Sequence, residues 1–269
     1  MLNDPYITKY DFKQDALAKV EKIWKDITDQ GFSPSKYPTM YLMGGQPGAG
    51  KSRALEKAKI PDGYNVLKIV GDDFRRECAL YDYLNKTYGK DSSKYTGEFA
   101  GAMVYLLKER AIKYRLNYSI EGTFRTATAP LNELKVAKES GYDSCVIICT
   151  CPKEVSWAST IERAQKMEQR GMFPRYVPKE HHDYVVEHLA ENVKTVFDSG
   201  LVDHLEIMSR EKVLYNSAEH FGYDSQRIIE VINGELNRNV NLQHGTENSH
   251  NLGIPRIKGK NRWFYHFTV

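Results

Sequence analysis

One glycine-rich segment, residues 40–52, constrains the fold of this chain more than any other part of its sequence. From Gly45 to Ser52 it matches the phosphate-binding pattern G-x-x-x-x-G-K-[ST]. The apolar residues 40–43 before the pattern predict a buried parallel strand, and residues 54–58 after it favour a helix. The pattern requires this order of strand, loop and helix. The segment therefore predicts an α/β fold that binds nucleotide phosphates.

The residue types of this loop explain how it would hold a nucleotide. Its glycines let successive backbone N–H groups point at phosphate oxygens, at the positive end of the following helix. Lys51 would reach the β- and γ-phosphates, and the Ser52 hydroxyl would bind Mg²⁺. A glycine-rich turn before a helix, with no ligand, is the alternative interpretation. The predicted nucleotide-binding residues are Gly45, Gln46, Pro47, Gly48, Ala49, Gly50, Lys51 and Ser52.

Composition and charge narrow the class of protein. The chain has 269 residues, 41% of them hydrophobic, which can bury a full core in one large α/β domain, with or without appendages. A net charge of +3 indicates no general attraction to nucleic acid or membranes. No apolar run approaches the ~20 residues that span a bilayer, and the N-terminus lacks the apolar region of a signal peptide. We therefore expect a cytosolic protein, in which Cys145, Cys149 and Cys151 are buried, reduced thiols.

Carboxylates follow two further predicted strands. Residues 66–70 predict the second strand, which leads directly into Asp72 and Asp73. A long helix predicted at residues 93–114 comes next, and a short third strand at residues 118–120 then leads into Glu121. Ligands of open α/β sheets lie beyond the carboxyl ends of the strands, so these side chains fall where chemistry is expected. A helix cap is the alternative role for Asp72, although a capping residue can also be functional.

Arginines and histidines gather later in the chain. Residues 145–151 predict a fourth strand, followed by a helix through Arg163 and a charged loop that carries Arg170 and Arg175. Such arginines are either solvated surface residues or the mobile lid arginines that neutralise charge during phosphoryl transfer. The run of His181, His182 and Asp183 suggests a metal site at first, but its position at a helix start favours a surface or capping role.

Absent motifs separate the classes of phosphate-loop protein. The sequence contains no N-K-x-D guanine motif and no Asp followed three positions later by Gly, so a switch GTPase is not indicated. It also has no apolar strand that ends in the Asp-Glu pair of many motor ATPases. The remaining layout is that of a kinase: a phosphate loop, an Asp after the next strand, a carboxylate after the third strand and arginines in a late lid.

The predicted architecture is an α/β fold with a mostly parallel central sheet of about five strands, flanked by helices. Residues 1–216 would form the kinase domain, with an N-terminal helix at residues 11–30 and a helical lid at about 152–180. In the N-terminal helix, Leu17, Val20, Trp24 and Ile27 form an apolar stripe that we expect to pack against the core. Residues 217–269 would add a C-terminal helix and a basic, aromatic tail, in the same domain or as an appendage. The tail could contact nucleic acid, but docking on the core is the preferred interpretation.

Six segments, taken together in order and spacing, resemble the zeta toxin family, the kinase half of bacterial toxin–antitoxin modules, and most closely its pneumococcal-type branch. The resemblance covers about residues 40–215. Its segments are GGQPGAGKS at 44–52, GDDFR at 71–75, YGKD at 88–91 with YTGEFAG at 95–101, IEGTFRT at 120–126, STIER at 159–163 and PRYVPKEHHD at 174–183. Six ordered matches are more specific than any one of them.

The resemblance implies an ATP-dependent kinase that phosphorylates the 3′-hydroxyl of the amino sugar in UDP-N-acetylglucosamine and so blocks cell-wall synthesis. Asp72 would be the general base, Lys51 and Ser52 would hold the phosphates and Mg²⁺, and Arg163 and Arg175 would stabilise charge in the transition state. The sugar-nucleotide pocket would be lined by Glu98, Glu121, Thr123 and Arg125. An antitoxin protein would bind the chain and cover the nucleotide site.

Two positions depart from the family pattern. Cys78 and Ala79 stand where the family usually has His-Pro, and Glu133 stands where it commonly has a hydroxyl residue. Both departures lie toward the predicted substrate side. Two other functions therefore stay open: a kinase of another hydroxyl acceptor (a nucleoside, an antibiotic or a polynucleotide end), and a non-catalytic, nucleotide-gated binding protein. The second has no need of a base such as Asp72 placed at an acceptor.

Overall fold

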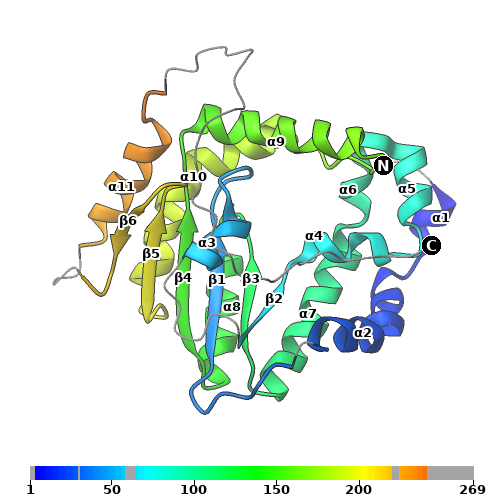
Figure 1. The fold of residues 1–269 in the computed structure, drawn as a ribbon, viewed down its shortest axis with the longest axis horizontal. Helices are drawn as coiled ribbons and strands as arrows, with labels where there is room; N and C mark the ends of the chain where they lie inside the picture. The colour runs from blue at the N-terminus through cyan, green and yellow to red at the C-terminus, as the bar shows by residue number, and fades with distance from the viewer. Residues whose placement is uncertain (1–3, 30, 58–64, 220–223, 241–269) are drawn as a thin grey trace, which may run out of the picture. The chain divides into compact units, whose positions relative to one another are not determined.

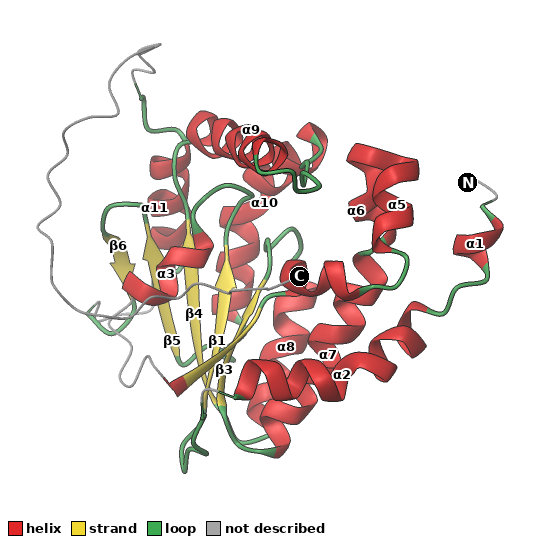
Figure 2. Cartoon of the chain, turned by 45° about the vertical axis from the view of Figure 1, so that its right-hand side comes forward, coloured by secondary structure: helices red, strands yellow, loops and turns green. Residues whose placement is uncertain are grey.

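The computed structural model describes residues 4–29, 31–57, 65–219 and 224–240. All of them except Val240 belong to one compact unit, residues 1–239. A central sheet carries helices on both of its faces (Figures 1 and 2). The basic, aromatic tail predicted at residues 254–269 lies outside the described residues. None of the described helices is long and apolar enough to cross a membrane.

The sheet has six strands in the order β2-β3-β1-β4-β5-β6. They are β1 (Thr39–Gly44), β2 (Val66–Ile69), β3 (Asn117–Glu121), β4 (Asp143–Cys149), β5 (His204–Met208) and β6 (Val213–Asn216). The first five are parallel, which confirms the predicted mostly parallel α/β fold, and β6 runs antiparallel to β5. The prediction of about five strands is therefore wrong by one. The strand β6 was not predicted, because it is a short edge strand in which only Tyr215 is buried.

Eleven α-helices accompany the sheet in the described residues. They are α1 (Pro5–Thr8), α2 (Phe12–Thr28), α3 (Lys51–Lys57), α4 (Gly71–Phe74), α5 (Tyr81–Tyr88), α6 (Ser92–Tyr95), α7 (Gly97–Lys113), α8 (Thr128–Glu139), α9 (Lys153–Gln169), α10 (Lys179–Asp198) and α11 (Gln226–Leu236). The 3₁₀ turn Arg75–Glu77 lies between α4 and α5, and the 3₁₀ turn Gly89–Asp91 lies between α5 and α6.

Two predicted helix boundaries are wrong. The single helix predicted from residue 93 to residue 114 is divided at Thr96, whose buried hydroxyl accepts a hydrogen bond from Arg75 at 2.7 Å. The helix predicted from residue 217 begins only at Gln226. The chain turns first at Asn216, whose side-chain oxygen accepts the N–H of Ala218. In both places a side chain bonds the backbone or another side chain where a continuous helix was expected.

Alternate residues of β1 enter two separate hydrophobic cores. Met40 and Leu42 pack on the face covered by α2, α7, α8, α10 and α11. Tyr41 and Met43 pack on the opposite face, where Ala54 of α3 joins the cluster. This period of two is expected of a strand buried on both faces. The centre of the sheet therefore fixes the position of the loop that leaves β1.

The predicted apolar stripe of α2 needs one correction. Leu17 was expected to pack, but it is 52% exposed. The buried positions of α2 are Phe12, Ala16, Val20 and Ile23, which recur at the spacing of one helix face. That face packs against α7. Val20 is buried, and Trp24 and Ile27 pack against the core, so the pattern identified the helix and all of its predicted core-facing residues except Leu17.

Candidate active site

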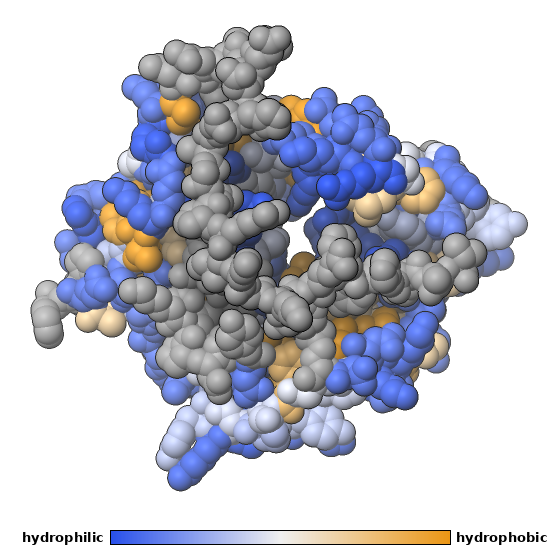
Figure 3. All heavy atoms as spheres, viewed as in Figure 1, coloured by the Kyte–Doolittle hydropathy of each residue, from blue (hydrophilic) through white to orange (hydrophobic). Residues whose placement is uncertain are grey.

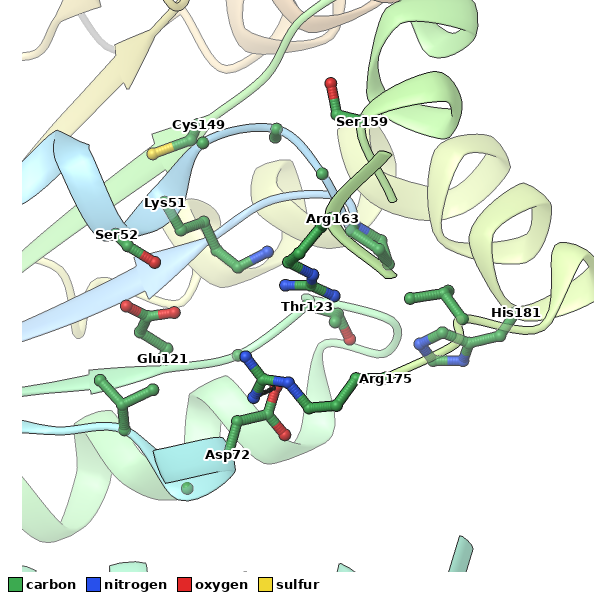
Figure 4. Close-up of a pocket in the computed structure, with 18 of the residues that line it drawn as sticks. Lys51, Ser52, Asp72, Glu121, Thr123, Cys149, Ser159, Arg163, Arg175 and His181 are labelled. Carbon is green, nitrogen blue, oxygen red and sulfur yellow. Dashed lines mark ion pairs between the residues drawn. The ribbon is translucent and has the colours of Figure 1, made fainter. Parts of the chain in front are cut away.

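The carboxyl ends of the central strands open onto a cavity of about 1010 Å³. Figure 3 shows an opening below the position of α9, with hydrophilic residues along its upper rim. The cavity is lined by the phosphate loop after β1, by residues after β2 and β3, by α9 and by the loop between α9 and α10 (Figure 4). The strand order places β2, β3 and β1 side by side. Segments far apart in the sequence therefore meet at one edge of the sheet.

The backbone of the phosphate loop closely approaches the backbones of β4 and α9. Gly45 and Gly48 have φ values of 132° and 81°, which side chains rarely adopt. A Cβ on Gly45 would lie 1.9 Å from the carbonyl oxygen of Cys149, and one on Gly48 would lie 2.1 Å from that of Ser156. The close approach of these backbones therefore requires glycine at both positions.

The predicted nucleotide-binding residues divide into two groups. Those from Pro47 to Ser52 line the cavity. Gly45 and Gln46 are not among the lining residues. Gln46 is fully buried, and its side-chain amide donates a hydrogen bond of 2.7 Å to the carbonyl oxygen of Cys151. Gly45 and Gln46 therefore belong to the base of the loop and not to the surface of the cavity.

Lys51 begins α3 and points into the cavity (Figure 4). Its ammonium group donates hydrogen bonds to the carbonyl oxygens of Gly45 and Gln46, at 2.9 and 3.2 Å. Burial lowers the pKa of Lys51, and the negative charge of Glu121 opposes that shift. The loop thus offers glycine N–H groups, a helix start and a cation, which is a donor set that fits a polyphosphate.

Asp72 lies in the first turn of α4, directly after β2. Its carboxylate binds Arg75 Nε at 2.8 Å through Oδ1 and the Arg175 guanidinium at 2.9 Å through Oδ2. Burial alone would raise the pKa of Asp72, but the charges of Arg175, Arg75 and Arg163 outweigh burial and lower it. The N-cap of α4 is Val70, so Asp72 is not the helix cap that the sequence left open. The side chain is an oriented, ionised carboxylate.

Glu121, at the end of β3, behaves in the opposite way. Burial raises its pKa, and the nearby charges of Asp73 and Asp72 raise it further against the attraction of Lys51. Two carboxylates that line one cavity therefore have pKa values shifted in opposite directions. Such divergence is typical of sites in which neighbouring acids have different tasks.

Glutamine in place of Glu121 is expected to raise the melting temperature by a few degrees at about pH 7. A raised pKa means that the folded state binds this proton more tightly than the unfolded chain. The stabilising contribution of Glu121 is thus present below its unfolded pKa and is lost as pH rises through the folded pKa. The charged carboxylate consequently opposes folding at neutral pH.

Calorimetry at about pH 7 and about pH 4 would test this, with Glu139→Gln on the exposed side of α8 as the control. The gain from Glu121→Gln should shrink at the lower pH, where the wild-type carboxyl is protonated. An equal gain at both pH values would contradict the electrostatic explanation.

The loop after β3 is held in place by α10. Phe124 is buried and has a φ of 53°, which is unusual for a residue with a side chain. The side-chain amide of Asn192 donates to the carbonyl oxygens of Phe124 and Arg125, at 3.0 and 2.9 Å. These bonds fix the loop that presents Thr123 to the cavity. Asn192 could not be predicted from the sequence, because it belongs to no motif.

Only two of the four predicted substrate-binding residues line the cavity. Glu121 and Thr123 line the cavity, but Glu98 and Arg125 are exposed and are not among the lining residues. The guanidinium of Arg125 instead lies 5.3 Å from the ring centre of Tyr184. The two predicted lid arginines do converge: the guanidinium groups of Arg163 and Arg175 both point into the cavity (Figure 4).

The two departures from the family pattern have different surroundings. Glu133 lines the cavity, and its carboxylate pairs with the nearly buried Lys108 at 2.7 Å. Cys78 is buried in the main core and is not a lining residue, so its expected place on the substrate side is not supported. All four cysteines are free, although Cys145 is only partly buried.

The two histidines of the run, His181 and His182, have different surroundings. His182 is buried, and its Nε2 lies 2.9 Å from the hydroxyl of Ser156. His181 lines the cavity, a position that the sequence did not predict. Within the described ranges, no three His, Cys, Asp or Glu side chains are grouped so that they could hold a metal ion. The Ser52 hydroxyl, the predicted ligand of Mg²⁺, is itself a lining group.

Comparison with known proteins agrees with this fold and site. The zeta toxin family model matches residues 24–220. Toxin PezT of Streptococcus pneumoniae serotype 4 (strain ATCC BAA-334 / TIGR4) is 33% identical over 208 residues, which are 77% of this chain and 82% of that protein. Toxin zeta of Streptococcus pyogenes is 33% identical over 213 residues, which are 78% of this chain and 73% of that protein.

A solved structure is similar over an even larger share of the chain. It comes from the PezAT chromosomal toxin–antitoxin system of Streptococcus pneumoniae, with a TM-score of 0.74 and 28% identity. The similarity covers 86% of this chain and 92% of that one. Since both the family model and these relatives span most of the sequence, phosphate loop and cavity residues included, this chain belongs to the zeta toxin family.

Proposed function

We propose that this chain is the toxin of a toxin–antitoxin pair and an ATP-dependent kinase of UDP-N-acetylglucosamine. It would phosphorylate the 3′-hydroxyl of the amino sugar and so withdraw a precursor from cell-wall synthesis. The observation that carries the proposal is the ionised Asp72, held by two arginines in the same cavity as the phosphate loop. A carboxylate placed opposite a nucleotide site is what transfer to an alcohol requires.

The phosphate side of the reaction would depend on residues 47–52. Their N–H groups and the Lys51 ammonium would bind the phosphates of ATP, and Lys51 would exchange its two carbonyl partners for phosphate oxygens. The Ser52 hydroxyl would hold Mg²⁺, which when bound neutralises charge on the β- and γ-phosphates. Such binding positions the nucleotide before any bond breaks.

The acceptor side would depend on Asp72. A sugar hydroxyl is a poor nucleophile, so Asp72 would accept its proton while the oxygen–phosphorus bond forms and the bond to the leaving ADP oxygen breaks. The lowered pKa of Asp72 keeps this base ionised, and Arg75 orients the carboxylate through Oδ1. Glu121 and Thr123 would bind other polar groups of the sugar nucleotide.

The two lid arginines would stabilise the charge that builds up on the transferring phosphoryl group. Arg163 comes from the helix α9, whereas Arg175 comes from the loop between α9 and α10. Arg175 bonds Asp72 at 2.9 Å, so it would lie between base and phosphoryl group and could contact both. Mobile cations at a lid are a recurrent device of kinases.

Partner and compartment follow from the same proposal. A similar solved chain comes from a toxin–antitoxin system, which supports an antitoxin protein as the partner of this chain. Such a partner would hold the enzyme inactive by covering the nucleotide site. The four free cysteines fit a reducing compartment, and we place the activity in the cytoplasm.

The first experiment is Mg²⁺–ATP turnover by the purified protein, with and without UDP-N-acetylglucosamine. ADP release should depend on this acceptor and should be matched by a phosphorylated sugar nucleotide. UDP-N-acetylmuramic acid is the matched control, because its 3-oxygen is blocked by an ether. Phosphorylation of this control would contradict the assigned hydroxyl.

A kinase of another hydroxyl acceptor is the second candidate, since the carboxylate of Glu133 lines the cavity where the family commonly has a hydroxyl. Binding of ATP without any effect of the sugar nucleotide would favour it. Nucleosides, hydroxylated antibiotics and oligonucleotides with free ends would then be tested in turn. Failure to bind ATP at all would overturn the kinase proposal itself.

A further inference from the structure

A tight turn between β5 and β6 presents an arginine to the same cavity. The hydroxyl of Ser209 accepts the N–H groups of Glu211 and Lys212, at 3.1 and 3.0 Å, and its own N–H donates to the carbonyl of Lys212. This network fixes the backbone on both sides of Arg210. The Arg210 side chain is exposed and lines the cavity together with Met208 and Ser209.

Arg210 contacts two walls of the cavity. Its guanidinium donates to the carbonyl oxygen of Gly48 in the phosphate loop and to the hydroxyl of Ser159 on α9, the latter at 2.8 Å. Ser159 lies four residues before Arg163, so both residues lie on one face of the helix. These bonds fix the guanidinium at the border between the phosphate loop and the helix that carries a lid arginine.

The strand order determines which part of a nucleotide would reach Arg210. Asp72 and Glu121 follow β2 and β3, on one side of β1, whereas Arg210 follows β5, on the other side. The phosphate loop leaves β1 between them. If the phosphates bind in that loop and the acceptor binds near the two carboxylates, the nucleoside would lie on the side of β4 and β5.

We propose that Arg210 binds the nucleoside end of the nucleotide, with its guanidinium plane stacked on the purine base. This inference rests on the proposed ATP-dependent function and adds the residue that would contact the base. A guanidinium is planar and weakly hydrated, and it stacks on aromatic faces more readily than an ammonium does. The hydrogen bonds to Gly48 and Ser159 lie at its edge, which pre-orients the plane for stacking.

Calorimetric titration of the full chain with three ligands, in the presence of Mg²⁺, would test the contact. The ligands are ATP, ribose 5′-triphosphate and inorganic triphosphate, which lose first the base and then the sugar. Arg210→Ala is expected to weaken ATP binding about tenfold and to change the other two affinities by less than about twofold. Arg210→Lys should show most of the same loss, because an ammonium keeps the charge but not the plane.

Two further variants separate stacking from a supporting role. Ser159→Ala keeps the guanidinium but removes one of the two hydrogen bonds that pre-orient it, so ATP affinity should fall by less than in Arg210→Ala while triphosphate affinity stays unchanged. Lys212→Ala removes a charge from the same turn and should alter none of the affinities. Melting temperatures of all variants would show that each is folded.

Equal losses for all three ligands in Arg210→Ala would overturn the inference, since the residue would then act on the phosphates or on the loop alone. Unchanged ATP binding would overturn it as well. If the wild-type chain binds ATP no more tightly than it binds inorganic triphosphate, a contact to the base is also excluded. Absence of binding by the wild type to every ligand would instead refute the proposed function, on which this inference rests.

Discussion

Replacing Asp72 with asparagine is expected to lower acceptor-dependent phosphoryl transfer by about 10²–10⁴-fold, the usual contribution of a general base. Asparagine keeps the size of the side chain but cannot take up the proton of the acceptor hydroxyl. ATP affinity should change little, because the carboxylate bonds Arg75 and Arg175 and none of the residues of the phosphate loop. Single-turnover formation of the sugar phosphate at saturating ATP measures the chemical step directly.

Asp73→Asn is the matched control for this experiment. Asp73 is the next residue along the chain and carries the same group, but it is not among the residues that line the cavity. Its substitution should leave phosphoryl transfer within a few-fold of wild type. Full activity in Asp72→Asn would show that another group accepts the proton, and equal losses in both variants would indicate a general effect on α4.

Alanine in place of Arg163 is expected to lower kcat by about 10³-fold, as when a kinase or GTPase loses an arginine that stabilises the transferring phosphoryl group. The acceptor KM should change far less, because this interaction is made mainly in the transition state. Arg163→Lys should recover part of the loss, since the charge remains but the two-pronged guanidinium is gone. Initial rates over a grid of ATP and acceptor concentrations would separate kcat from KM.

Arg170→Ala is the control for Arg163. Arg170 is an exposed arginine at the C-terminal cap of the same helix, and it does not line the cavity. Its loss should leave both kinetic constants near those of wild type. A rise in KM with unchanged kcat in Arg163→Ala would show that this arginine serves ground-state binding and not transfer.

The parts of the site that could be predicted are those that a short run of consecutive residues identifies. The phosphate loop is a dense motif, and Asp72 and Glu121 directly follow apolar strands whose ends meet at one edge of the sheet. Arg163 and Arg175 needed the resemblance to a family, because nothing local separates a lid arginine from a solvated one. Their convergence on the cavity is a fact of the fold.

The residues that sequence reasoning missed act through distant partners. Arg210 bonds a loop residue 162 positions away, and Asn192 bonds a carbonyl 68 positions away. Neither has a neighbour in the sequence that marks its role. The reverse error occurred at Arg125, where a motif position predicted a pocket residue but the side chain stacks on Tyr184 instead. Local pattern reveals which backbone segments reach the site, and tertiary packing decides which side chains turn toward it.

The strand β2 lies at one edge of the sheet, whereas β1 has a strand on either side. Asp72 thus follows a strand with a single neighbouring strand, whereas Lys51 follows a strand that is paired on both sides. Substitutions near an edge disturb few contacts, so they are tolerated more easily than those at the centre. We therefore expect substitutions at the acceptor end of the cavity to cost less stability than substitutions in the phosphate loop. The glutamate at position 133, which lines the same cavity as Asp72, is one departure that this asymmetry would permit.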